Sequence, residues 1–234
     1  MRAIYKRELR SYFTSMTGYL FIAVVVFFIG IYFMANNLYY GDPGFSTTLV
    51  NVMVVLLVAV PVLTMRSMAE ERRSRTDQLL LTAPVSVSGV VMGKYLAMVT
   101  ILAIPMLLSC ICPLIIAANG TSQLMSDYAS IFAFFLMGCV FVAVGMFISA
   151  LTESQIIAAV GTFAALLTLY LWDSLMQFLP DALANVLGLF SFSSVLYNFA
   201  YYSVFDVRGV VLYLTLAGLF VFLTVQALQK RRWN

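Results

Sequence analysis

Acidic and basic side chains gather in one short stretch of the sequence. Within eight positions lie Glu70, Glu71, Arg72, Arg73, Arg75 and Asp77. The apolar triplet 79–81 (LLL) and Pro84 follow. Such a charged turn followed by leucines predicts a short helix on the membrane surface that presents its charges to water or to a partner. A solvated loop that only fixes topology is the alternative, but acidic residues contribute little to orientation, which favours the helix.

Residues suited to enzymatic chemistry are scarce. The chain contains no histidine, which removes the commonest metal ligand and the usual general base. Cys110, Cys112 and Cys139 lie within apolar runs and are expected to be packing residues. The pair Gly93-Lys94 lacks the glycine spacing of a phosphate-binding loop. We therefore expect no catalytic activity, no metal site and no cofactor bound by this chain.

The composition indicates a membrane protein. Of 234 residues, 63% are hydrophobic and 10% are charged, and the mean hydropathy is +1.00. A soluble domain carries about 25% charged residues, so this chain has too little polar surface to cover a water-soluble globule.

Six apolar runs are long enough to cross the hydrocarbon core, which requires about 20 residues per helix. The predicted spans are 16–35, 46–65, 96–118, 129–151, 154–172 and 209–228. The fold class is therefore an all-α membrane protein, with one six-span domain over residues 16–234 after an N-terminal segment, 1–15.

The basic residues predict the orientation. Six spans place both termini on one side, and positive charge favours the cytoplasmic side. On that side would lie twelve residues: Arg2, Lys6, Arg7, Arg10, Arg66, Arg72, Arg73, Arg75, Lys94, Lys230, Arg231 and Arg232. The outer side would hold only Arg208. We expect both termini and the loop 66–94 to be cytoplasmic.

Two further segments carry periodic apolar residues. Residues 1–15 predict an amphipathic helix on the inner membrane surface. The alternative is a basic segment without a defined helix, which would set the orientation of the chain equally well. Its apolar face would consist of Tyr5, Leu9, Tyr12 and Phe13, and its basic residues are Arg2, Lys6, Arg7 and Arg10. The outer segment 173–208 is too apolar for a loop in water, so it would form either interfacial helices or a re-entrant hairpin.

No source of energy is visible within the spans. Ion-coupled carriers usually keep an ionisable residue near mid-membrane, and none of the predicted spans does. A transport pathway whose energy comes from another protein chain fits this pattern.

Several stretches resemble the type-2 ABC transporter permeases, and more narrowly the branch of gliding-motility and copper-processing permease subunits. The most specific is 61–74 (PVLTMRSMAEERRS), which continues through Thr76, 79–86 (LLLTAPVS) and Gly93-Lys94. The stretches 6–15 (KRELRSYFTS), 190–194 (FSFSS) and 230–233 (KRRW) agree. One departure is Arg75, where the family usually has glycine.

The resemblance implies a permease subunit of the bacterial cytoplasmic membrane that pairs with a second permease subunit and with ABC ATPase chains, which bind ATP and Mg. It also implies an elbow helix over 1–15, a coupling helix within 66–94 and an outer re-entrant segment over 173–208. The expected ATPase-contacting residues are Glu70, Glu71, Arg72, Arg73, Thr76 and Asp77. No nucleic-acid partner is implied, and the substrate is unknown.

Two other functions stay open on the sequence. A membrane anchor could hold an extracytoplasmic partner, such as a lipoprotein, without moving a solute. A passive channel is disfavoured, because no span has the polar lining of a water-filled pore.

Overall fold

The computed structural model describes residues 1–74, 86–118, 123–176, 197 and 207–233. Every regular element within these residues is helical, as the sequence predicts. In chain order the elements are α1 (Arg2–Thr14), α2 (Met16–Tyr32), η1 (Phe33–Tyr39, a π-helix), α3 (Ser46–Thr64), α4 (Ala69–Arg73), α6 (Val87–Ser109), α7 (Ile111–Ala118), α8 (Leu124–Leu151), α9 (Gln155–Met176) and α12 (Val207–Trp233). The outer segment predicted over 173–208 lies mostly outside the described residues.

Six helical segments are long and apolar enough to cross a membrane, which confirms the predicted number of spans. They are Met16–Tyr39, Ser46–Arg73, Val87–Ala118, Leu124–Leu151, Gln155–Trp172 and Val207–Lys230. The third begins at Val87, well before the predicted start at 96, because Lys94 lies within the helix instead of ending it. The side chain of Ser86 caps this helix by accepting a hydrogen bond from Gly89 N at 3.3 Å.

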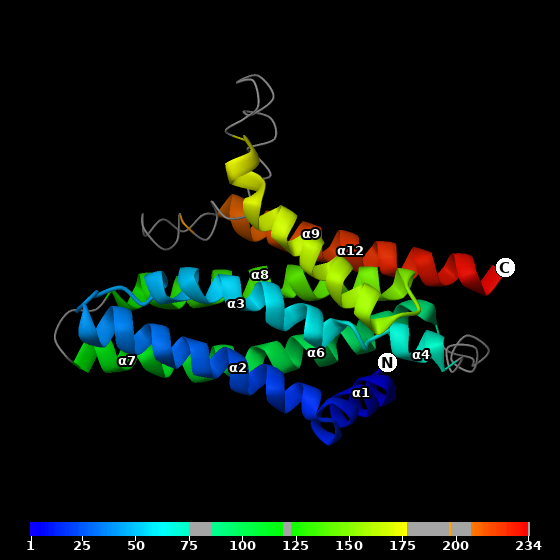
Figure 1. The fold of residues 1–234 in the computed structure, drawn as a ribbon, viewed down its shortest axis with the longest axis horizontal. Helices are drawn as coiled ribbons and strands as arrows, with labels where there is room; N and C mark the ends of the chain where they lie inside the picture. The colour runs from blue at the N-terminus through cyan, green and yellow to red at the C-terminus, as the bar shows by residue number, and fades with distance from the viewer. Residues whose placement is uncertain (75–85, 119–122, 177–196, 198–206, 234) are drawn as a thin grey trace.

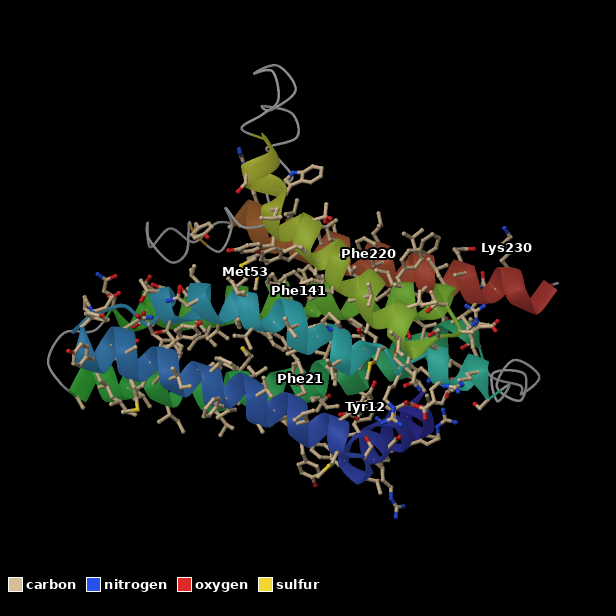
Figure 2. All side chains as sticks on the ribbon, viewed as in Figure 1. Tyr12, Phe21, Met53, Phe141, Phe220 and Lys230 are labelled. Atoms are coloured by element: carbon tan, nitrogen blue, oxygen red, sulfur yellow. The ribbon has the colours of Figure 1, made fainter. Side chains whose placement is uncertain are left out.

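Helix α8 forms the centre of the bundle. It contacts α3, α6, α9 and α12, and most of its residues are buried. Figure 2 shows Phe141 of α8 and Met53 of α3 within the packed interior, whereas Lys230 extends away from it. Gly138 allows close approach of α6, since a Cβ there would lie 2.7 Å from Leu102 Cδ2. Gly145 likewise faces Thr64 of α3, so small residues allow these helices to pack closely.

The two ends of the bundle differ in chemistry. Both termini lie at the same end as α1 and α4, which we call the charged end (Figure 1). At the opposite end, Asn37 of η1 donates hydrogen bonds to Asp42 O at 2.9 Å and Gly44 O at 2.8 Å. The buried Asp127 of α8 accepts a hydrogen bond from Phe45 N at 2.9 Å, just before α3 begins. These bonds satisfy backbone groups that a lipid environment would leave unpaired.

The contact between Gly145 and Thr64 generates a test of packing. We expect Gly145→Ala to lower the free energy of unfolding by about 1–3 kcal/mol, because the added methyl overpacks the interface of α3 and α8. Thermal unfolding in detergent micelles measures this. Gly218→Ala is the matched control, since a Cβ at Gly218 meets no atom within 4 Å. Equal thermal unfolding midpoints for Gly145→Ala and Gly218→Ala would contradict the close contact of α3 and α8 at Gly145.

Candidate functional site at the charged end

The short helix α4 is fixed to the end of α8. Ser149 Oγ accepts hydrogen bonds from Met68 N at 3.2 Å and Ala69 N at 3.1 Å, and it also lies 3.2 Å from Met65 O, to which it donates. Arg72 donates to Ala150 O at 2.8 Å and pairs with Glu153 at 3.3 Å. The turn between α3 and α4 is therefore held against α8, because one buried hydroxyl bonds three of its backbone groups.

A buried lysine joins α6 to α4 and α1. Lys94 Nζ lies 2.9 Å from Glu71 Oε2 and 3.6 Å from Glu8 Oε1, and it donates to Ser67 O at 2.7 Å. Its side chain is only 2% exposed. A buried ammonium needs compensating charge and hydrogen bonds, and here it has both.

Arg7 of α1 completes the arrangement. Its guanidinium lies 2.7 Å from Glu8 Oε1 and 2.9 Å from Glu71 Oε1. The hydrogen bond to Glu8, with the nearby charges of Glu8 and Glu71, raises the pKa of Arg7 against the opposing effect of desolvation. We call Arg7, Glu8, Glu71 and Lys94 the charged cluster. Its two cations and two carboxylates link three helices that are separate in the sequence.

Helix α1 is docked by close contacts as well as by charge. Tyr12 OH lies 3.4 Å from Leu63 O, and Tyr5 OH lies 3.0 Å from Thr100 Oγ1 of α6. Burial is the main cause that raises the pKa of Tyr12, so this phenol stays neutral. A Cβ on Gly93 would lie 3.1 Å from Ile4 Cγ2, so α1 and α6 approach closely.

A polar cavity of about 260 Å³ opens between α1, the start of α2, the turn after α3, α4 and α6. Its charged lining consists of Arg7, Arg66 and Lys94 together with Glu8, Glu70 and Glu71. Arg66 and Glu70 form a bidentate pair, with N to O distances of 2.9 and 3.1 Å. Ser67 also lines this cavity, and within the described part of the chain its buried hydroxyl has no hydrogen-bond partner.

The residues predicted to contact an ATPase have different surroundings. Glu70, Glu71 and Arg72 are partly buried and make ion pairs within this chain. Arg73 is exposed at the end of α4. Thr76 and Asp77 lie outside the described residues.

The basic residues predicted for the membrane surface divide in a similar way. Arg2, Lys6, Arg7 and Arg10 are all exposed on α1, but Arg7 also belongs to the charged cluster. Sequence reasoning missed Glu8 and Ser149, and it missed the role of Lys94 in joining α6 to α1 and α4. For Lys94 a signal was present, since apolar residues enclose it on both sides within a helical run.

Comparison with known families gives this geometry its context. A profile described as ABC-2 family transporter protein matches residues 29–227, which is most of the chain and includes α4 and Lys94. The chain belongs to this family. It is a multi-pass permease component, a class of transporter subunit that is generally not itself catalytic. ABC-2 permeases normally work with an ABC ATPase. No curated protein matched the chain.

The burial of Lys94 generates a test of this ABC-2 permease's charged end. We expect Lys94→Met to leave Glu8 and Glu71 short of a cation. The free energy of unfolding should fall by about 3–5 kcal/mol, as when one partner of a buried pair is removed. Amide hydrogen exchange should rise in residues 1–14 and 66–74. Arg10→Met, which removes an exposed cation from the same surface, should leave exchange unchanged. Equal exchange in both variants would refute the structural importance of Lys94.

Proposed function

We propose that this chain is the permease subunit of an ATP-driven transporter, in which a separate ATPase chain binds ATP and Mg. In this proposal α1 is the elbow helix and the segment 66–94, which contains α4, is the coupling region. Both termini and the charged end face the cytoplasm of a bacterium, and a second permease subunit completes the substrate path. Residues quoted above favour the gliding-motility and copper-processing branch.

The observation that carries this proposal is the attachment of α4. Through Ser149 and Arg72 it is bonded to α8, and through Glu71 it is paired with Lys94 of α6 and Arg7 of α1. A partner that displaces α4 must therefore displace the ends of α6 and α8 or break a buried ion pair. That arrangement converts movement at the surface into movement of membrane-spanning helices.

The placement of the charges divides the predicted contact residues by role. Glu71 and Arg72 transmit displacement, because their side chains already hold partners in this chain. Arg73 is free to meet a carboxylate on the ATPase, since it is exposed at the end of α4. Thr76 and Asp77 follow in the sequence and extend the proposed contact. Arg2, Lys6 and Arg10 of α1 face anionic lipid.

Charge reversal separates these roles. We expect Arg73→Glu to reduce the amount of ATPase chain that co-purifies by about tenfold, a change equivalent to about 1.4 kcal/mol of binding free energy. Lys230→Glu is the control, because Lys230 is an exposed cation at the same end of the bundle but on α12. The measurement is the ratio of ATPase to permease after affinity purification from detergent.

Two results would contradict the proposed contact. One is full retention of the ATPase by Arg73→Glu, and the other is an equal loss in Lys230→Glu.

In the complex, Glu71→Gln should keep the ATPase bound but lower substrate-dependent ATP hydrolysis, since it weakens transmission and leaves the contact in place.

A further inference from the structure

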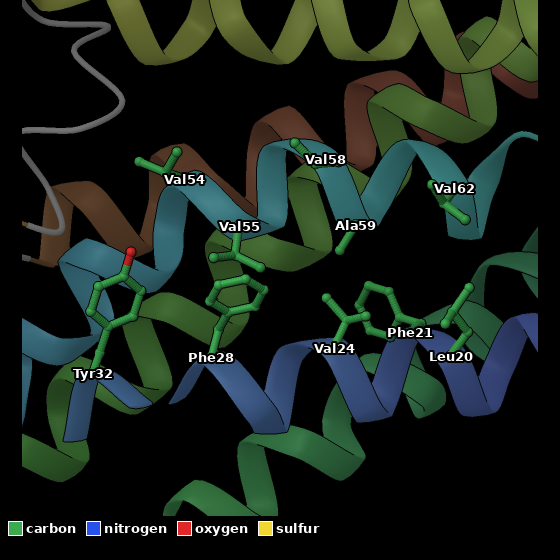
Figure 3. A pocket seen from close by; sticks show the side chains of 10 residues that line it. All are labelled: Leu20, Phe21, Val24, Phe28, Tyr32, Val54, Val55, Val58, Ala59 and Val62. Atoms are coloured by element: carbon green, nitrogen blue, oxygen red, sulfur yellow. The ribbon is translucent and has the colours of Figure 1, made fainter. Parts of the chain in front are cut away.

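An apolar groove continues the line of the polar cavity between α2 and α3. Its volume is about 380 Å³, within the range of ligand-binding clefts. Figure 3 shows side chains of the two helices pointing toward one another across it, among them Val24 and Phe28 of α2 and Val55 and Ala59 of α3. The lining is almost entirely apolar, and the hydroxyl of Tyr32 lies at its far end.

The cavity and the groove share helix faces. On α2 the cavity lining ends at Thr17, and the groove begins at Leu20 and Phe21, one helical turn later. On α3 the groove ends at Val62, and the cavity includes Arg66 of the turn that follows the end of α3 at Thr64. Residues three or four apart lie on the same face of a helix, so on α2 the polar lining of the cavity passes directly into the apolar lining of the groove.

The length of the apolar part matches a single leaflet. Leu20 to Tyr32 spans about 18 Å at the helical rise of 1.5 Å per residue. One leaflet contributes about half of the 30 Å hydrocarbon core. The groove is therefore long enough for the acyl chain of a phospholipid whose headgroup lies at the charged end.

The charges of the cavity define the headgroup. Three cations, Arg7, Arg66 and Lys94, are balanced by three carboxylates, Glu8, Glu70 and Glu71. A ligand with net charge would leave one set uncompensated, whereas a zwitterion offers a phosphate to the cations and an ammonium to the carboxylates. The buried Ser67 hydroxyl, which lacks a partner in the described part of the chain, is a ready donor to a phosphate oxygen.

We propose that the cavity and the groove together bind one zwitterionic phospholipid of the surrounding membrane, with the headgroup among the charged residues and an acyl chain between α2 and α3. The lipid joins α1, α2 and α3 at the charged end, where the described protein contacts leave space. This proposal does not depend on an ATPase partner.

The test uses the full chain reconstituted in nanodiscs with equal amounts of phosphatidylethanolamine, which is zwitterionic, and phosphatidylglycerol, which is anionic. After mild detergent extraction, mass spectrometry identifies the phospholipids that stay bound. We expect about one lipid per chain, with phosphatidylethanolamine enriched several-fold over phosphatidylglycerol. Equal retention of the two headgroups, or no retained lipid, would overturn the proposal.

Two variants locate the site. Val58→Trp fills the groove and should reduce the retained lipid to background, whereas Val160→Trp on α9 should not. The two valines form a matched pair, since Val58 is 58% exposed and Val160 is 63% exposed. Loss of lipid in both variants, or in neither, would overturn the assignment. A change from dimer to monomer in Val58→Trp with lipid retention unchanged would instead assign the groove to a second copy of this chain.

A third variant tests the headgroup. Glu70→Gln removes one carboxylate from the balanced set and should shift retention toward phosphatidylglycerol, because the cavity then carries net positive charge. An unchanged ratio of the two lipids would refute the placement of the headgroup in the polar cavity. Since the readout is lipid identity, this outcome is independent of ATP-driven transport.

Discussion

The charged end of this permease depends on one buried ion pair, between Lys94 of α6 and Glu71 of α4. An ammonium that is 2% exposed is tolerated only when charge and hydrogen bonds replace the water that it has lost. Glu71, Glu8 and Ser67 O supply them from three different segments. Because Lys94 needs these partners, it fixes α1 and α4 against the bundle, and it makes the positions of the two helices interdependent.

The membrane-spanning part follows a different constraint. Burial of apolar surface does not distinguish helix contacts from lipid contacts there, so close packing and polar bonds must select the neighbours. Gly138 and Gly145 allow α6 and α3 to approach α8, and Ser149 and Asp127 bond to the chain at opposite ends of α8. Helix α8 is consequently the reference against which α3 and α6 are placed.

The space between α2 and α3 follows from the same geometry. The bonds of Asn37 and Asp127 order the chain around the start of α3, and the charged cluster holds α1 beside its end. Between these two polar regions the facing side chains are aliphatic or aromatic and leave a groove. A membrane protein can keep such a groove at little cost, because lipid fills it where water would not.

The sequence by itself determined the helical class, the number of spans and the grouping of charge at one end. Each span must satisfy its own backbone hydrogen bonds, so a run of apolar residues is sufficient to define it. The family resemblance also rested on short stretches such as 61–74, and the match over residues 29–227 confirms the ABC-2 family at that level. The narrower branch and the ATPase contacts stay predictions.

Only the tertiary structure decided which charges face inward. Arg7 and Glu71 are 64 positions apart, and Lys94 bonds Ser67 across 27 positions, so no local pattern could pair them. The predicted loop ends at 94 because a lysine usually marks the end of an apolar span, whereas the partners of Lys94 on α1 and α4 allow it to lie inside a helix. Ser149 lies in an apolar run of the sequence, and only the structure shows that its hydroxyl bonds the turn before α4. Charge and hydropathy depend on residue identity, but burial and pairing depend on which helices meet.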